Sequence, residues 1–389
     1  MKTLFISNLY PSADAPTRGM YNVHVFGAIA RHCETRLISP RPWWTRIKQP
    51  GKLFTISREN RGGMETTYPT FWTLPRYGVS HNGTALYHSL RGQVKRLRRD
   101  FPFDVILAAW AYPDAVAAAR LALDFDCPLV VNVLGSDINA LAQMSALRPQ
   151  IVASLRQAQR VISVSGALRE RVLELGLPPE QVIVQHNGVD REKFTLQDGA
   201  AIRAGLDLPP NRPIILYVGN FVPEKGVDTL VTAIKHLRES GQKDVLLALV
   251  GSGSLEPMLH SLVAQHGLQD SVRFCGRKPH DEIPDWMAAC DVFCLPSLRE
   301  GCPNVVLESL SSGRPVVASR VGGVPELLDD TTGLLVPAGE PEAFAKALHT
   351  ALCRNWNAEA LRESTRHNSW ELAGDAYYAA LESAVNNRK

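Results

Sequence analysis

Two glutamates flank the stretch of this sequence whose residue types point most directly to chemistry. Glu300 and Glu308 are separated by seven residues, the first of which are Gly301-Cys302-Pro303-Asn304-Val305. Residues 292–295 have the composition of a short buried strand, and Pro303 suits the first turn of a following helix. A helix N-terminus carries free backbone N–H groups and a partial positive charge. The stretch therefore predicts a phosphate site just beyond the end of a strand.

Glu308 adds a second feature to this predicted anion site. It falls about two turns into the predicted helix, which ends near Gly313, and on this phasing its carboxylate reaches a group attached to a bound phosphate. A carboxylate there suits a ribose, because it accepts hydrogen bonds from two vicinal hydroxyls. Two glutamates at this spacing alone more often belong to an ordinary strand–helix unit with exposed side chains. The surrounding residues must therefore decide between the two interpretations.

Those surrounding residues carry a resemblance to a known family. The pattern Glu300-Gly301-x-Pro303-Asn304-x-x-x-Glu308 strongly resembles the signature of retaining GT-B glycosyltransferases of family 4. The likeness extends from about residue 3 to residue 385. It implies an α/β fold of the GT-B type, in which two Rossmann-like domains with parallel sheets face a central cleft. Further matches to the family lie at residues 16–19, 187–190, 217–226, 313–318 and 322–326.

The resemblance also implies roles for individual side chains. Glu308 binds the ribose of a nucleotide sugar, whereas Glu300 and Lys225 are catalytic: Glu300 contacts the transferred sugar, and Lys225 neutralises the leaving diphosphate. These roles are coherent, because breaking a glycosidic phosphate bond creates positive charge on the sugar and negative charge on the diphosphate. No metal and no other cofactor is expected. The donor-binding residues implied by the resemblance are Gly19, Asn220, Arg277, Gly301, Cys302, Pro303, Asn304, Val305 and Glu308.

Several positions depart from the family pattern. Leu107 and Ala109 occupy positions that are often histidine, and Leu134 stands where a His or Arg is common. Asn220 replaces an Arg that frequently supports the diphosphate. These differences affect the sugar contacts more than the nucleotide site, and they are compatible with a different donor, an altered acceptor mode or a weakened enzyme. The residues assigned to the vicinity of the acceptor or the transferred sugar are Ala109, Trp110 and Asp137.

A chain of 389 residues is too long for one ordinary domain, so two domains are expected. Short apolar runs alternate with amphipathic stretches, which is typical of parallel sheets covered by helices on both faces. We predict an acceptor-binding Rossmann-like domain at 1–190, a linker at 191–212 and a nucleotide-sugar-binding Rossmann-like domain at 213–368. A final helix at about 369–385 is expected to pack back on the first domain. The predicted strands are residues 3–7, 35–38, 105–108, 129–133, 161–164, 182–184, 214–218, 245–250, 272–275, 292–295, 315–318 and 334–336, and the predicted helices of the first domain are 21–32, 114–123 and 167–175.

The composition favours a cytoplasmic protein. No apolar run approaches the roughly 18 residues typical of a membrane-spanning helix, and the run after Lys2 is too short for the core of a signal peptide. The seven cysteines are odd in number and form no Cys-x-x-Cys pair, which agrees with a reducing compartment. Cys290, Cys294 and Cys302 are not expected to hold a metal, because the first two flank a buried strand.

Positive charge is concentrated at the start of the chain. The net charge is +3, but residues 1–100 hold 16 Lys and Arg against 5 Asp and Glu. Within that region Leu86, Leu90, Val94 and Leu97 recur at helical spacing among arginines, and residues 41–48 combine paired tryptophans with cations. Two interpretations stay open: docking on an anionic membrane, or a solvated basic helix packed by its leucines. Nucleic acid is not expected as a partner, because no recognition motif accompanies the charge.

The sequence thus predicts a retaining glycosyltransferase. It is expected to move a sugar from a UDP- or GDP-linked donor to a hydroxyl of a glycan acceptor, lipid-linked and destined for a surface polysaccharide. A double displacement needs a second carboxylate as nucleophile, and the sequence offers no candidate for it. Two alternatives are a sugar-nucleotide epimerase of GT-B architecture and a non-catalytic protein that binds nucleotide sugars.

Overall fold

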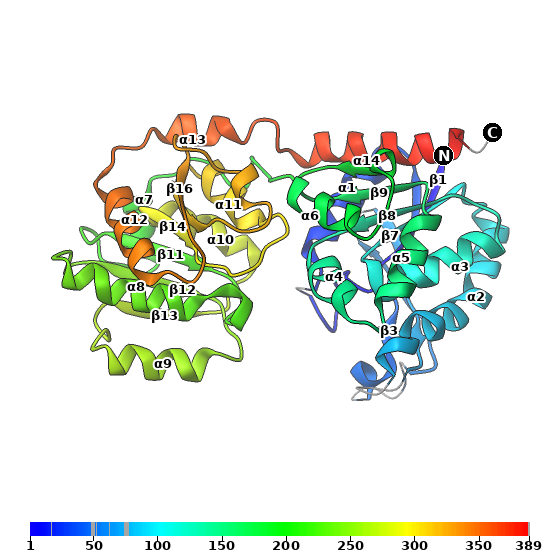
Figure 1. Cartoon of the computed structure of the whole chain (residues 1–389), viewed down its shortest axis with the longest axis horizontal. Coiled ribbons are helices and arrows are strands. Elements are labelled where there is room, and N and C mark those ends of the chain that lie inside the picture. Colours follow the sequence, from blue (N-terminus) through cyan, green and yellow to red (C-terminus); the bar gives the residue numbers. More distant parts are fainter. Residues whose placement is uncertain (17, 48–50, 52, 62, 74–77, 388–389) are drawn as a thin grey trace. The chain divides into compact units, whose positions relative to one another are not determined.

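The protein divides into two compact units (Figure 1). The computed structural model describes residues 1–16, 18–47, 51, 53–61, 63–73 and 78–387. The first unit comprises Met1–His186 together with Trp370–Lys389, and the second comprises Asn187–Ser369. Each unit is built on a sheet with helices packed against it, so the predicted α/β class is confirmed. Thr17 of the predicted glycine loop and Lys48 of the tryptophan-containing segment lie outside the described residues.

The sheet of the first unit has eight strands in the order β10-β9-β8-β7-β1-β2-β5-β4. All neighbouring strands run parallel except the hairpin of β4 and β5. This hairpin was not predicted, because its strands are largely polar and carry no apolar run. The strands of the first unit, including a separate two-stranded ribbon of β3 and β6, are β1 (Lys2–Ile6), β2 (Glu34–Ile38), β3 (Arg41–Pro42), β4 (Ser57–Arg61), β5 (Met64–Tyr68), β6 (Thr70–Phe71), β7 (Val105–Ala109), β8 (Leu129–Val133), β9 (Arg160–Ser163) and β10 (Val182–Val184).

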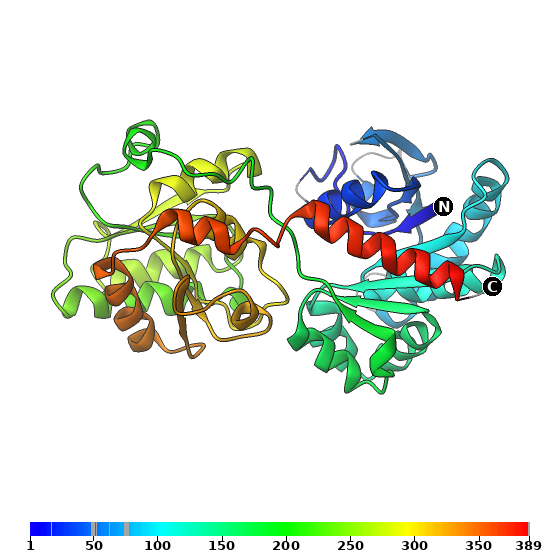
Figure 2. The same ribbon diagram turned by 90° about the horizontal axis from the view of Figure 1, so that it is seen from above.

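The last helix of the chain belongs to the first unit. It packs against α1, and Figure 2 shows it, in red, lying across this unit. Trp370 and Tyr377 are buried there, and the Tyr377 hydroxyl lies 2.9 Å from the hydroxyl of Tyr21. The chain therefore returns to its first unit after completing the second. The helices of this unit are α1 (Met20–Ala30), α2 (Asn82–Asp100), α3 (Val116–Asp124), α4 (Ser136–Asn139), α5 (Arg148–Gln157), α6 (Gly166–Leu173) and α14 (Trp370–Asn386).

The second unit is a doubly wound, fully parallel sheet in the order β13-β12-β11-β14-β15-β16. Successive strand residues point to opposite faces, so Ile215 and Tyr217 join one apolar core while Ile214 and Leu216 join the other. Its strands are β11 (Ile214–Val218), β12 (Leu246–Val250), β13 (Val272–Gly276), β14 (Val292–Leu295), β15 (Val316–Ser319) and β16 (Gly333–Val336). Its helices are α7 (Gly199–Gly205), α8 (Val227–Glu239), α9 (Glu256–Gln265), α10 (Ile283–Ala289), α11 (Asn304–Ser311), α12 (Pro341–Cys353) and α13 (Ala358–Ser364).

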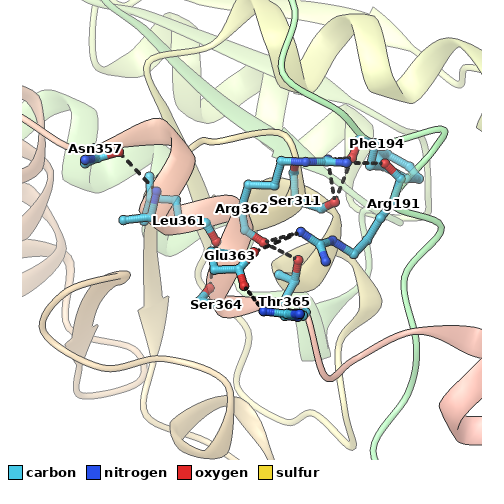
Figure 3. Close-up of polar contacts among 11 residues, drawn as sticks. Arg191, Phe194, Ser311, Asn357, Leu361, Arg362, Glu363, Ser364 and Thr365 are labelled. Atoms are coloured by element: carbon cyan, nitrogen blue, oxygen red, sulfur yellow. Dashed lines mark hydrogen bonds and ion pairs between the residues drawn. The ribbon is translucent and has the colours of Figure 1, made fainter.

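Residues 191–212, predicted as a linker, are an integral part of the second unit. Phe194 and Leu208 are buried in one of its two cores. The Arg362 guanidinium donates to the backbone oxygens of Arg191, Phe194 and Ser311, at 2.6–2.9 Å (Figure 3). The polar, proline-rich end of this segment suggested a linker, but its apolar side chains are covered by the fold and its backbone is held by arginine.

Candidate functional site

The loops that follow β11 and β14 lie side by side, because these strands are neighbours in the sheet. Gly226 ends the first loop with φ +59°, and a Cβ there would stand 2.3 Å from the Pro296 oxygen. Gly322 has φ +51°, and a Cβ there would stand 2.0 Å from the oxygen of Glu300. Only glycine fits at either place. Close backbone packing thus fixes the positions of Lys225 and Glu300.

α11 begins immediately after the second of these loops. Pro303 is its N-cap residue and Asn304 its first residue, so the predicted helix start is confirmed to within one position. The side chain of the N-cap residue, Pro303, makes no capping hydrogen bond, which leaves first-turn N–H groups available to an anion. Gly313 ends the helix region with φ +71°, and its N–H donates to Leu310. Glu308 lies in the second turn, nearer to the N-terminus than the two turns predicted.

Lys225 and Glu300 form an ion pair. The Lys225 Nζ lies 2.6 Å from the Glu300 Oε1, and the Ser297 hydroxyl donates to the same oxygen at 2.6 Å. The side chain of Glu300 is only 8% exposed and that of Lys225 29%. Two donors on one oxygen offset the cost of burying this carboxylate. The structure therefore joins the two residues predicted to be catalytic.

Glu308 also has a basic partner, one that the sequence analysis did not identify. The His280 Nε2 lies 3.1 Å from the Glu308 Oε1, and the His280 Nδ1 lies 2.8 Å from the Nζ of Lys193. His280 opens the turn that follows β13, at the same edge of the sheet as the other loops. That position after a strand was the one sequence signal that could have identified it.

Asn187 holds the loop before α11 in place. Its Nδ2 donates to the Cys302 oxygen at 2.9 Å and to the Asn304 Oδ1 at 2.5 Å. Burial raises the pKa of the Cys302 thiol to about 12, so this side chain stays protonated and does not act as a nucleophile. Cys302 and Asn304 therefore shape the loop, while Val305 lies in the first turn of the helix. Asn187 was recognised as part of a motif but not as a site residue.

Arg277 extends toward the loop after β11. Its Nη2 lies 3.4 Å from the Asn220 Oδ1, and its Nε donates to the Ser252 hydroxyl at 3.3 Å. β13 is separated from β11 by one strand, so the long Arg277 side chain brings its charge across the sheet edge to Asn220. Asn220, which stands where the family often has an arginine, is thus approached by Arg277 from another loop.

The predicted site residues of the first unit have different environments. Gly19 precedes α1 with φ +65°, and a Cβ there would stand 2.3 Å from the Leu9 oxygen. Ala109 is fully buried, so its methyl group presents nothing to a sugar. Asp137 is also fully buried and accepts hydrogen bonds from three backbone N–H groups around it. Trp110 is partly buried and has φ +112°.

The leucine stripe of α2 faces inward. Leu86, Leu90 and Val94 are fully buried, which favours the second interpretation, a basic helix packed by its leucines. Exposed apolar side chains of this unit instead include an aromatic cluster, in which Phe54 and Trp72 are 84% and 48% exposed. Trp72 stacks on Trp43 and lies tilted against Phe54, with ring centroids 5.9 and 5.8 Å apart. None of the helices that the structure describes has the length and apolar character that crossing a membrane requires.

Solved structures share this fold over the full chain. Sucrose-phosphate synthase from Thermosynechococcus elongatus is 21% identical, with a TM-score of 0.84 and complete coverage of both chains. The HepE protein of Anabaena, solved in complex with UDP-glucose, is 21% identical with a TM-score of 0.69, over 100% of this chain and 99% of that one. The GT-B type of α/β fold is confirmed by these likenesses.

Several sequence relatives match shorter stretches of the chain. A D-inositol 3-phosphate glycosyltransferase from Streptomyces bingchenggensis is 35% identical over 54% of this chain and 49% of its own length, so the chain spans about half of that relative. The amylovoran biosynthesis glycosyltransferase AmsK of Erwinia amylovora is 29% identical over 64% of this chain and 62% of its own. The lipopolysaccharide core biosynthesis glycosyltransferase LpsE of Rhizobium meliloti is 33% identical over 60% of this chain and 67% of its own.

Family models account for most of the chain and agree with the motif of α11. Residues 30–193 match the model described as Glycosyltransferase Family 4. Residues 198–368, which hold Lys225, Glu300 and Glu308, match the model described as Glycosyl transferases group 1. Together with the agreement in fold and the 33% identity to LpsE, these matches show that the chain belongs to the group 1 glycosyltransferases.

Proposed function

We propose that this protein transfers a sugar from a nucleoside-diphosphate donor to a hydroxyl of a glycan acceptor, with retention of configuration. The observation that carries the proposal is the arrangement in the second unit, where the Lys225–Glu300 ion pair, the N-terminus of α11 and Glu308 lie on adjoining loops and one helix. The complex of HepE with UDP-glucose supports a donor of this class.

In this proposal the donor is held by charge and by backbone N–H groups. The first turn of α11 binds the diphosphate, and Glu308 accepts hydrogen bonds from the ribose hydroxyls. An ammonium has three donors, so Lys225 can keep its contact with Glu300 and still reach a phosphate oxygen. As the bond to the sugar breaks, negative charge collects on the diphosphate, where Lys225 and the helix stabilise it. Neither a metal nor another cofactor has a role in this scheme.

The environment of Glu300 supports an electrostatic role rather than a nucleophilic one. Its Oε1 already accepts from Lys225 and Ser297, both at 2.6 Å. A carboxylate oxygen engaged by an ammonium and a hydroxyl is a weaker nucleophile, but its charge still stabilises a cationic sugar nearby. We therefore assign Glu300 to the stabilisation of the transferred sugar. The departing phosphate, in this scheme, accepts the proton of the acceptor hydroxyl. Both assignments lead to retention without a covalent intermediate.

Arg277 supplies a charge that Asn220 lacks. Within the described residues the charges of two neighbouring cations are balanced by carboxylates, Lys225 by Glu300 and Arg299 by Glu224. Arg277, by contrast, contacts the neutral side chains of Asn220 and Ser252. We assign Arg277 to the leaving diphosphate, with Asn220 orienting its guanidinium.

The acceptor is assigned to the first unit and is proposed to be lipid-linked, in the synthesis of a surface polysaccharide. The names of AmsK and LpsE refer to amylovoran and to the lipopolysaccharide core, which supports this pathway class. The basic first hundred residues and the exposed aromatic cluster of Phe54 and Trp72 suit the cytoplasmic face of an anionic membrane.

Liposome co-sedimentation at low and high salt tests this membrane docking. The Phe54→Ala/Trp72→Ala variant is expected to lose most binding to anionic vesicles. Leu123→Ala is the matched control, because Leu123 is an exposed apolar residue, 69% exposed, elsewhere in the same unit. Wild-type protein that stays in the supernatant with anionic lipid at low salt would contradict the docking proposal.

Calorimetric titration of UDP, GDP and ADP into the wild type and Glu308→Ala tests the donor site. Loss of charged hydrogen bonds to a ribose is expected to weaken the best nucleotide by roughly 1.5–3 kcal/mol, about tenfold or more. No binding by any nucleotide would overturn the proposal. Incubation with donor alone separates a transferase from an epimerase, because only the epimerase changes the sugar without an acceptor. Binding without turnover across a broad acceptor panel would favour a non-catalytic protein.

A further inference from the structure

Glu308 is a carboxylate held away from water. Its side chain is 10% exposed, and a charged group in such a position requires hydrogen-bond partners. The structure supplies one from a different element, the His280 ring, whose Nε2 lies 3.1 Å from the Glu308 Oε1. The two residues are 28 positions apart, and the turn at His280–Glu282 brings them together. The orientation of this carboxylate is therefore set by the chain that follows β13.

The other ring nitrogen of His280 determines the direction of this hydrogen bond. Its Nδ1 lies 2.8 Å from the Nζ of Lys193. A lysine ammonium can only donate, so Nδ1 accepts, and the ring proton then resides on Nε2. The Nε2–H donates to Glu308. His280 in this arrangement is a neutral imidazole that holds Glu308 without cancelling its negative charge.

Other side chains hold Lys193 and the His280 ring in place. The Lys193 Nζ lies 2.6 Å from the Asp281 Oδ1, which balances its charge. The ring of Phe194 meets the His280 ring edge-on, with centroids 5.6 Å apart. Lys193 and Phe194 both lie in the segment predicted to be a linker, whose backbone Arg362 fastens to the unit. That segment therefore contributes to the donor site.

We propose that Lys193 and His280 are positioning residues for Glu308. His280 occupies the Glu308 Oε1, and Lys193 holds the His280 ring. Together they direct the carboxylate toward the ribose hydroxyls, an inference that rests on the ribose-binding role of Glu308 proposed above. A free glutamate side chain would have to be ordered when the nucleotide binds, and that ordering would weaken binding. Because Lys193 and His280 hold the Glu308 carboxylate, its orientation is already set in the folded protein before the nucleotide binds.

The test compares variants of His280 that differ in their ability to donate. In His280→Gln the side-chain amide can donate to Glu308 from near the position of Nε2, whereas His280→Phe keeps the ring shape without a donor. Each variant, with wild type and Glu308→Ala, is titrated with the nucleoside diphosphate that binds best and with its 2′-deoxy and 3′-deoxy forms. Lys193→Met provides a second variant that leaves the ring in place.

We expect His280→Phe to bind the nucleotide about tenfold more weakly and to lose most of its preference over the deoxy forms. His280→Gln should stay within about threefold of wild type and keep the preference, and Lys193→Met should be intermediate. A donor-free variant that retains the full preference for the hydroxylated nucleotide overturns the inference, as does a Gln variant as impaired as the Phe variant. If wild type itself binds no nucleotide, or Glu308→Ala leaves binding unchanged, the proposed function fails instead.

Discussion

The Lys225 ammonium and the Glu300 carboxylate lie 2.6 Å apart and join the loops of two adjacent strands, β11 and β14. Each residue is assigned to a different side of the bond that breaks, Lys225 to the diphosphate and Glu300 to the sugar. Their contact means that neither charge can be removed without changing the environment of the other.

Variants of this ion pair should therefore show coupled losses. Glu300→Gln and Lys225→Met are each expected to lower kcat by roughly a hundredfold or more, because both stabilise charge in the transition state. The double variant should lose less than the product of the two. Glu224→Gln is the matched control, since Glu224 pairs with the exposed Arg299 and should stay near wild type. Steady-state kinetics with wild-type turnover in Glu300→Gln would refute the assigned role.

Arg277 offers a test of where charge is needed. Arg277→Gln is expected to weaken the preferred nucleoside diphosphate about tenfold and its monophosphate much less, because the guanidinium is assigned to the leaving phosphate. Adding Asn220→Arg to this variant should restore much of the lost affinity. Calorimetry with both nucleotides separates the roles: equal losses for the two would instead place Arg277 at the base or the ribose.

The buried carboxyl group of Asp114 is expected to make the stability of the protein depend on pH. Burial raises the pKa of Asp114 to about 7, although its Oδ2 accepts hydrogen bonds from the Asn8 N–H and side chain at 2.9 Å. An unfolded Asp has a pKa of about 3.9, so between about pH 4 and 7 the folded protein binds the extra proton. This contribution to stability is present at low pH and is lost as pH rises through 7.

Asp114→Asn is expected to remove that dependence. Relative to the variant, wild type should lose up to about 1.4 kcal/mol of stability per pH unit as pH rises within this window. Unfolding curves measured at pH 5, 6 and 7 give the difference directly. If stability varied with pH in the same way for wild type and Asp114→Asn, the Asp114 carboxyl would have the same pKa in the folded and unfolded states, which would contradict the prediction.

Arg362 should be important for the stability of the second unit. Arg362→Met removes hydrogen bonds to three backbone oxygens (Figure 3) and is expected to cost roughly 2–3 kcal/mol. Arg366→Met, which removes only an exposed pair with Glu363, should change stability by less than about 0.5 kcal/mol. Chemical denaturation of both variants provides the comparison. Similar stabilities would mean that the other contacts of residues 191–194, among them the hydrogen bond from the Ser311 hydroxyl to the Phe194 oxygen, are sufficient to hold them.

The sequence by itself determined the class of fold and the position of the helix N-terminus that we propose as the phosphate site. Strands such as β8, β11 and β14 were predicted at the observed residues, because a parallel strand covered on both faces is a short, continuous apolar run. The start and end of α11 followed from Pro303 and Gly313, whose backbone preferences are local. The polar hairpin of β4 and β5 had no such local signal.

Only the tertiary structure decided which side chains meet. The pairing of Lys225 with Glu300 depends on the order β11-β14 in the sheet, and the contact of His280 with Glu308 depends on where the turn after β13 lies. The sequence contains these residues but not the distances between them. Contacts between residues 28 or 75 positions apart are set by the packing of whole strands and helices. The same packing buried the leucines of α2 and incorporated residues 191–212 into the second unit, because apolar side chains gain more by covering a core than by facing water.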